Sequence, residues 1–228
     1  TPDEGEIDLD GINVRRRLPR TMADLYIVPE EITLPSCKLS SYVATTACFY
    51  PKFDMELLRQ HLQLFDIPES IHLGHLSMGQ KKKIALAFAM ACNTNLLLMD
   101  EPTNGLDIPG KSAFRRFIAS SMSDDRIFII STHQVRDVSQ ILDNVLIMNN
   151  GRIMLDQPVS EIQARLLFGE TTDSDVAAKA FYSEKTFGGY AVVLPNTTNA
   201  DSELNLELLF EMAVERPELI KHIFTKDN

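Results

Sequence analysis

Two adjacent carboxylates follow one short apolar run of the chain. Residues 96–99 are large and apolar, and Asp100 and Glu101 come directly after them. The run is too short for a helix, so we expect a strand, and open α/β sheets bind ligands at the carboxyl ends of their strands. Placed there, Asp100 can hold Mg²⁺, and Glu101 can orient or deprotonate a water that attacks a γ-phosphate. Taken alone, the pattern fits a strand that ends in a polar turn equally well, because short motifs give many false matches.

A second candidate site lies at the start of an apolar segment, residues 84–92. Ser77 followed three residues later by Gln80 is a capping box, which is an ordinary way to begin a helix. The same helix start presents unpaired N–H groups and the positive end of the helix dipole, and so can bind an anion. Gly79 lets the backbone come close to a phosphate, and capping alone would not require a glycine. The segment is therefore a candidate phosphate site as well as a helix start.

His133 is the third candidate, and it closely follows another short apolar run, residues 127–130. A single histidine is more often structural than catalytic. This one follows the same kind of strand as the two carboxylates, which places it at the same edge of a parallel sheet. There a histidine can contact a γ-phosphate and the charge that develops on it during hydrolysis.

Short apolar runs alternate with segments of helical periodicity over most of the chain. The third candidate strand is the run 25–28. This alternation predicts an α/β fold with a mostly parallel sheet and flanking helices. The helical stripes, which we expect to face the core, are Leu58, Leu62 and Phe65 after a cap at Asp54; Phe114, Phe117, Ile118 and Met122; and Val135, Val138 and Ile141 or Leu142.

Turn and linker signals dominate the last third of the chain. Two apolar runs flank an Asn-Asn-Gly segment at 149–151 and predict an antiparallel hairpin, because an Asn-Gly pair readily adopts the positive φ of a tight turn. A helix is expected over 160–168, followed by a polar, acidic linker at 169–175. Residues 176–228 then form a small α+β unit of their own. The elements expected in it are a strand over 190–194 and an amphipathic helix over 204–214.

Taken in order, four motifs resemble those of the ABC ATPase family. They are Leu-Ser-x-Gly-Gln at 76–80, an apolar strand ending in Asp-Glu-Pro at 100–102, Asn-Gly-Leu-Asp at 104–107, and Ser-Thr-His at 131–133. As a set they are far more specific than any single short motif. The resemblance implies a P-loop NTPase fold of the ABC type that binds ATP and Mg²⁺ and hydrolyses ATP.

The resemblance also implies a role for each matched residue. Ser77, Gly79 and Gln80 would form the signature motif, Asp100 would bind Mg²⁺, Glu101 would be the catalytic base, Asp107 would lie in the D-loop, and His133 would be the switch histidine. Glu30 stands at the Q-loop position, where the family usually has a glutamine. A carboxylate there can still approach Mg²⁺ or water, but it adds negative charge beside Asp100 and Glu101.

The family also implies an organisation and a set of partners. We expect an ATPase domain over residues 1–168, incomplete at its N-terminus, with a helical subdomain at 34–73 and a signature helix at 77–92; a linker at 169–175; and an accessory domain at 176–228. Two ATPase subunits, in a homodimer or a heterodimer, would sandwich two ATP molecules. They would drive a separate membrane-spanning transporter subunit. The chain would then be cytoplasmic and peripheral on the inner face of the cell membrane.

Residues 105–112 offer a rival interpretation, because they fit the P-loop pattern G-x-x-x-x-G-K-[ST] between a strand and a helix. Pro109 removes an N–H from a loop that would act through N–H groups, and Asp107 would repel phosphate. We therefore interpret the segment as a D-loop followed by a helix, and expect the family's phosphate-binding loop upstream of Thr1, absent from this sequence. A degenerate, non-catalytic subunit is an alternative, although a dead site has no chemical need for the acidic pair and His133.

Composition limits the remaining classes of function. Thirty-two acidic against 22 basic residues give a net charge of -10, which argues against nucleic acid as a partner, because a phosphate backbone is neutralised by clustered Lys and Arg. An ABC protein of translation or DNA repair would need a second cassette, long heptad arms or a basic surface, and the sequence has none of these. The three cysteines have no paired or metal-ligand spacing, as expected for reduced cytosolic thiols.

Overall fold

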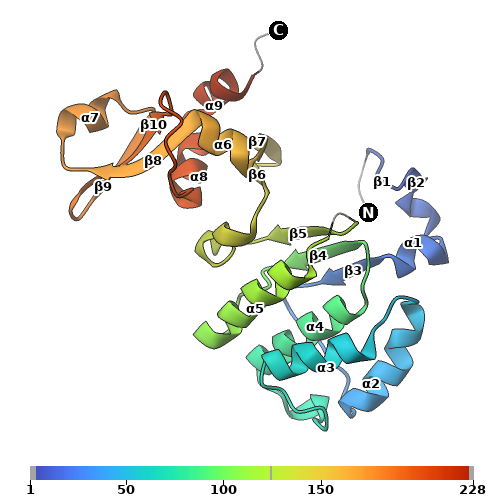
Figure 1. The fold of residues 1–228 in the computed structure, drawn as a ribbon. Helices are drawn as coiled ribbons and strands as arrows, with labels where there is room; N and C mark the ends of the chain where they lie inside the picture. The colour runs from blue at the N-terminus through green and yellow to red at the C-terminus, as the bar shows by residue number, and fades with distance from the viewer. Residues whose placement is uncertain (1–3, 124, 226–228) are drawn as a thin grey trace. The chain divides into compact units, whose positions relative to one another are not determined.

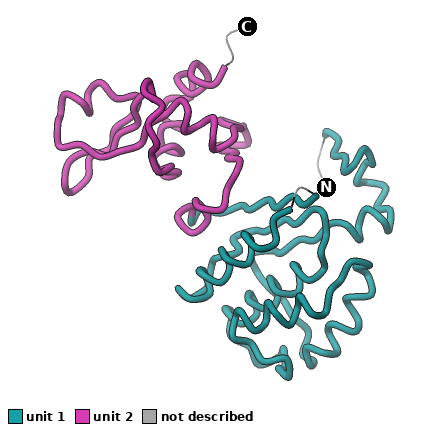
Figure 2. The backbone as a smooth tube through the Cα atoms, viewed as in Figure 1, with its two compact units in different colours: residues 1–134 teal, residues 135–228 magenta. Residues whose placement is uncertain are grey.

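The computed structural model describes residues 4–123 and 125–225. The chain divides into two compact units, Thr1–Gln134 and Val135–Asn228, which are called the first and the second unit below. Figure 2 colours the two units separately, and Figure 1 shows their helices and strands. The first three and the last three residues, at the outer ends of the predicted domains, lie outside the described residues. None of the described helices is long and apolar enough to span a bilayer.

A three-stranded parallel sheet lies at the centre of the first unit. Its strands are β3 (Leu25–Val28), β4 (Leu96–Asp100) and β5 (Ile127–Ser131), and β4 lies between the other two. All three strands predicted from the sequence are confirmed. β4 and β5 each continue one residue further than predicted, so that Asp100 pairs with Ser131 at the carboxyl edge of the sheet.

Two long helices cover one face of this sheet, α4 (Met78–Ala91) and α5 (Ile108–Ser121) (Figure 1). From Ile84 onward every residue of α4 is buried, as expected for a helix that is apolar on all sides. In α5 the predicted stripe is buried up to Ile118, whereas Met122 caps the helix end and is exposed. The other face of the sheet carries exposed isoleucines, which are Ile27, Ile127 and Ile129.

The predicted helical subdomain, residues 34–73, contains α2 (Leu39–Thr46) and α3 (Met55–Leu64). The predicted cap of α3 is confirmed, because the Asp54 carboxylate accepts hydrogen bonds from the N–H groups of Glu56 and Leu57 at 2.8 and 3.1 Å. Its predicted stripe, Leu58, Leu62 and Phe65, is buried. The remaining elements of the first unit are β1 (Asp8–Leu9), β2 (Ile12–Asn13), η1 (Val14–Arg16), α1 (Pro19–Ala23), η2 (Ala47–Phe49) and η3 (Leu73–His75).

The second unit begins with two 3-10 helices, η4 (Val135–Asp137) and η5 (Ser139–Ile141), where the sequence indicates one continuous helical stripe. Val138, between them, is the buried residue of this stripe. The predicted hairpin follows and is confirmed as β6 (Asn144–Asn149) and β7 (Arg152–Pro158). Its turn uses positive φ at Asn150 (49°) and Gly151 (73°), as the Asn-Gly pair predicts.

The predicted helix 160–168 and linker 169–175 differ from the structure. Helix α6 (Val159–Arg165) ends early, and the next residues form strand β8 (Leu166–Thr171), which pairs antiparallel with β10 (Gly189–Pro195). β10 also pairs with β9 (Tyr182–Thr186). Helix α7 (Ser174–Lys179) begins within the predicted linker and includes its last two residues. The polar end of β8 becomes a strand because a distant partner supplies its backbone hydrogen bonds, which local composition does not reveal.

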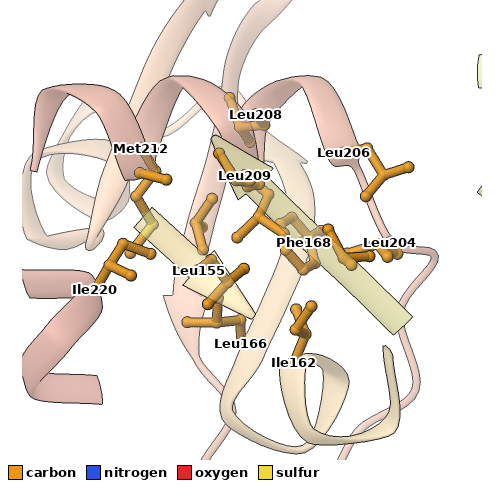
Figure 3. Close-up of a cluster of buried hydrophobic side chains, with 14 of the residues drawn as sticks. Leu155, Ile162, Leu166, Phe168, Leu204, Leu206, Leu208, Leu209, Met212 and Ile220 are labelled. Carbon is orange, nitrogen blue, oxygen red and sulfur yellow. The ribbon is translucent and has the colours of Figure 1, made fainter. Parts of the chain in front are cut away.

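One apolar core holds the second unit together. Figure 3 shows side chains of α8 (Leu206–Glu215) packed with residues of β7, α6, β8 and α9 (Pro217–Phe224). The strand predicted at 190–194 and the helix predicted at 204–214 are confirmed as β10 and α8. Because of this shared core, residues 135–168 lie in one compact unit with the C-terminal residues, and the boundary between the units follows Gln134.

Candidate functional site

The two carboxylates and His133 meet at the carboxyl edge of the parallel sheet. The register of β4 and β5 places Asp100 opposite Ser131, whose hydroxyl donates a hydrogen bond of 2.7 Å to Asp100 Oδ1. The N–H of Glu101 donates to the carbonyl of Ser131 at 2.8 Å. Segments that lie about thirty positions apart in the sequence are thereby held side by side by strand pairing.

Glu101 is the most highly constrained residue of this edge. Its φ is 44°, in the left-handed region that few residues other than glycine adopt. Its carboxylate accepts hydrogen bonds from the Thr132 hydroxyl at 2.9 Å and from the His133 N–H at 2.8 Å, and it lies 2.6 Å from His133 Nδ1. The Glu101 side chain is 13% exposed and that of His133 is 73% exposed. A fixed carboxylate therefore lies beside an accessible imidazole.

Hydrogen bonding controls the ionisation of Glu101. Burial raises the pKa of its carboxyl group, but the hydrogen bonds from Thr132 and then from His133 outweigh this effect and hold the pKa below its usual range. The group is therefore ionised at neutral pH. An ionised, oriented carboxylate is suited to hold a water molecule and to accept a proton from it.

Asp100 is suited to share a divalent cation with a phosphate. Its residue is exposed at the end of β4. Within residues 4–123 and 125–225, no cluster of three or more His, Cys, Asp or Glu side chains could hold a metal ion by itself. Mg²⁺ at phosphate sites needs no such cluster, because one or two carboxylates hold it together with waters and phosphate oxygens. Asp100 fits that requirement.

Glu30 lies just beyond the end of β3. Its Oε1 accepts a hydrogen bond of 3.0 Å from Nδ2 of Asn104, a residue of the loop that follows Glu101. The Glu30 carbonyl accepts a bond of 2.7 Å from Lys82 Nζ. Both contacts connect the Q-loop position to segments that carry the other motifs.

The start of α4 has the geometry predicted from its sequence. Ser77 Oγ accepts a hydrogen bond of 3.2 Å from the Gln80 N–H, and Gln80 Oε1 accepts one of 3.0 Å from the Ser77 N–H. The structure adds a reason for Gly79 that the sequence does not reveal. A Cβ at this position would lie 3.0 Å from the carbonyl oxygen of Gly105, so a side chain there would push against the D-loop.

Asp107 joins the D-loop to α4 and begins α5. Its Oδ1 accepts the Gly110 N–H at 3.1 Å and lies 3.0 Å from Lys83 Nζ, and the Lys83 hydrogen bond holds the pKa of Asp107 below its usual value. The Lys111 N–H donates to the Asp107 carbonyl at 2.9 Å. Two N–H groups that a phosphate loop at 105–112 would need are therefore used within a helix start, which favours the D-loop interpretation.

Apart from Glu30, which contacts Asn104 and Lys82, the predicted site residues fall into two groups. Asp100, Glu101 and His133 form the first, and Ser77, Gly79, Gln80 and Asp107 surround the start of α4. The sequence analysis assigned no individual role to Thr132 or Asn104, which lie within two of the motifs, and none to Lys82. Lys82 offered one signal, because it is the middle residue of a Lys-Lys-Lys run that enters a helix buried on every side.

Comparison with known proteins gives a consistent result. Residues 1–104 match the family described as ABC transporter. The sulfate/thiosulfate import ATP-binding protein CysA of Vibrio cholerae is 31% identical over 162 residues, covering 66% of this chain and 43% of that protein. The ABC transporter ATP-binding protein YtrB of Bacillus subtilis is 20% identical over 229 residues, covering 97% of this chain and 78% of that protein.

The fold agrees with these sequence matches. The structure of CbiO1 from Clostridium perfringens, described as part of the ABC transporter complex CbiONQ, superimposes with a TM-score of 0.55 at 26% identity, covering 71% of this chain and 68% of that one. The family match includes the start of α4 and both carboxylates at the end of β4. The chain therefore contains an ABC nucleotide-binding domain.

Proposed function

We propose that this chain is the ATP-binding and ATP-hydrolysing subunit of an ABC transporter, and that hydrolysis powers transport through a separate membrane-spanning subunit. The observation that carries the proposal is the ionised Glu101 carboxylate, which is oriented by Thr132 and His133 beside Asp100. The ABC nucleotide-binding domain supports ATP as the ligand. Relatives whose names describe ATP-binding proteins of importers and transport complexes support the transport role.

Each residue of the sheet edge has a part in the proposed reaction. Asp100 would hold Mg²⁺, which would neutralise the charge that develops on the phosphate. Glu101 orients the attacking water and accepts its proton as the water oxygen bonds to the γ-phosphorus, while the bond between that phosphorus and the bridging oxygen of the leaving ADP breaks. The exposed imidazole of His133 would meet the γ-phosphate through Nε2, while its Nδ1 and its backbone N–H stay bonded to Glu101. Glu30 would help to hold the loop that follows Glu101, through the hydrogen bond that its carboxylate accepts from Asn104.

The second group of residues acts on a partner copy in this proposal. Met78, in the first turn of α4, is 70% exposed, so the N-terminal end of the helix dipole faces outward. Ser77, Gly79 and Gln80 of one subunit would bind the ATP of the other, in a homodimer or a heterodimer. Asp107 keeps the D-loop next to this helix start through Lys83. The membrane-spanning partner would hold the subunit at the cytoplasmic face of the membrane.

Replacing the carboxylate by its amide tests the proposal. In the full-length protein, Glu101→Gln should lower kcat for ATP hydrolysis by about 10²–10⁴-fold, because the amide cannot accept the proton. ATP binding, measured by equilibrium titration, should persist. Glu203→Gln is the matched control, because it makes the same chemical change at an exposed residue of the second unit. Hydrolysis at the normal rate by Glu101→Gln would show that another group is the base.

A further inference from the structure

Lys82 is a buried lysine in the middle of the nucleotide-binding domain. It belongs to the second turn of α4, and only 4% of its surface is exposed. Burying an ammonium group is costly unless its three N–H donors find acceptors. Lys82 Nζ lies 2.7 Å from the carbonyl oxygen of Glu30, 3.2 Å from that of Glu101 and 3.5 Å from that of Pro29. Three donors thus meet three backbone acceptors.

The three acceptors come from the ends of two neighbouring strands. Pro29 and Glu30 follow β3, and Glu101 follows β4. β3 and β4 pair only as far as Val28 and Met99, so beyond that point no strand pairing joins the two segments. The Lys82 ammonium takes the place of that pairing and joins both ends to α4.

The charges around Lys82 match this position. Burial lowers the pKa of its ammonium group, while the carboxylates of Glu30, Asp100 and Glu101 act in the opposite direction. Lys82 is therefore a cation placed among the acidic groups that the proposed reaction uses. An uncharged side chain of the same length would take this donor away from the carbonyl oxygens of Pro29 and Glu30, and would leave that of Glu101 with the Asn104 N–H alone.

Glu101 depends on this contact more than the other two residues do. A left-handed backbone at a non-glycine residue is strained and persists only where the surroundings hold it. The Glu101 N–H donates to the Ser131 carbonyl, and the Glu101 carbonyl accepts hydrogen bonds from Lys82 Nζ at 3.2 Å and from the Asn104 N–H at 3.1 Å. Both backbone groups of the residue are thus fixed before its carboxylate meets Thr132 and His133.

We propose that Lys82 is a positioning residue for ATP hydrolysis, holding Glu101 in the backbone conformation that directs its carboxylate to His133. This inference rests on the proposed ATPase function. It also connects the two halves of the site, because Lys82 lies on the helix that begins at Ser77. A displacement of α4 when the partner's ATP binds is transmitted to the Glu101 carbonyl through one side chain.

Substitution of Lys82 in the full-length protein separates positioning from general structure. Lys82→Met keeps the length of the side chain and removes all three donors. We expect kcat to fall about 10- to 100-fold, the effect of a small misplacement of a catalytic group, with the KM for ATP changed less than about twofold. Lys82→Arg keeps the charge and donors and should recover part of the loss. Lys81→Met makes the same change one residue earlier on the same helix, and it should leave kcat within about twofold.

A double substitution gives a readout that a merely structural role would not move. If Lys82 acts through Glu101, then Lys82→Met should change the residual rate of the Glu101→Gln protein by less than about twofold. An equal loss in both backgrounds, or a normal kcat in folded Lys82→Met protein, would overturn the positioning role. Should Lys82→Met fail to fold by circular dichroism, Lys82→Gln takes its place, because its shorter side chain has no ammonium group, and a normal kcat and pH profile in that folded protein would also overturn the positioning role.

These outcomes are distinguishable from failure of the proposed function. Wild-type hydrolysis that Glu101→Gln abolishes supports the ATPase assignment whatever Lys82 does. If the wild-type full-length protein binds ATP and does not hydrolyse it, the ATPase assignment fails first, and the positioning role fails with it because there is no reaction to position.

Discussion

The Glu101 carboxylate receives its hydrogen bonds from the segment that follows β5, and not from its own strand. A carboxylate with a lowered pKa is a weaker base than a free one, and it stays ionised at lower pH. The arrangement therefore favours orientation of the water over strength of the base. It also makes the pKa of Glu101 dependent on the Thr132 hydroxyl.

Thr132→Val should move the acid limb of the ATPase pH profile to higher pH. The Thr132 hydroxyl lowers the pKa of Glu101, so its removal raises that pKa, and protonation then begins at a higher pH. The measurement is kcat against pH for the wild type and the variant. Thr132→Ser, which keeps the hydroxyl, should follow the wild-type profile. An acid limb that stays in place in Thr132→Val would mean that Glu101 does not control it.

The same shift affects stability in a defined direction. Because the pKa of Glu101 is depressed in the folded state, its hydrogen bonds stabilise the fold above the usual carboxyl pKa of about 4.5. That contribution is lost as the pH falls through the folded-state pKa. It is therefore present at neutral pH and disappears only under acidic conditions.

Part of this site could be predicted from single residues and part could not. The meeting of Asp100, Glu101 and His133 follows from strand pattern, because parallel strands deliver their carboxyl ends to one edge. The hydroxyl of Thr132 and the ammonium of Lys82 were not predicted. Their roles depend on the reach of a side chain across elements, and periodicity carries no information about that.

At the scale of elements, α4 combines two requirements at one end. In its capping box, the side-chain oxygens of Ser77 and Gln80 each accept a hydrogen bond from the backbone N–H of the other residue. Its close approach to the D-loop requires Gly79. A substitution at this helix start can therefore act on stability, on ATP binding by the partner copy, or on both.

Two substitutions of Ser77 separate these effects. Ser77→Ala removes the cap and should destabilise the first unit by about 1 kcal/mol. Ser77→Asp keeps a good cap, so its stability should stay within about 0.5 kcal/mol of the wild type, but its negative charge should weaken ATP binding in the dimer. Urea unfolding and ATP titration measure the two properties. Normal ATP affinity in Ser77→Asp would show that Ser77 does not face a phosphate.

The elements were predicted well where local signals agree. The strands of the parallel sheet, the cap at Asp54 and the Asn-Gly turn follow from apolar runs and from turn chemistry. β8 was missed, since the polar residues at its end form a strand only through pairing with β10. The stripe 135–142 indicated one helix and gave two 3-10 turns, each three residues long.

At the scale of the whole molecule, two compact units share one chain, each with its own apolar core. In the second unit α8 supplies much of this core, and Leu209 is fully buried there (Figure 3). The first unit holds the described part of the candidate site. A defect in one core should therefore leave the other unit folded.

Leu209→Ala tests this independence. The cavity should destabilise the second unit by about 2–5 kcal/mol, while hydrogen exchange of the β4 amides in the first unit stays at the wild-type rate. Phe210→Ala is the matched control, because the neighbouring side chain is 41% exposed, and its effect should stay within about 0.5 kcal/mol. Equal loss of protection in β4 and β10 would show that the two units unfold as one.

The left-handed backbone at Glu101 has a consequence for how this position evolves. A glycine would adopt φ of 44° without strain, so the residue that suits the backbone best is not the one present. Selection for stability and selection for turnover therefore act in opposite directions here. In lineages that lose the activity, the change favoured at position 101 is therefore to glycine, which relaxes the turn, and a retained glutamate indicates that the chemistry is still under selection.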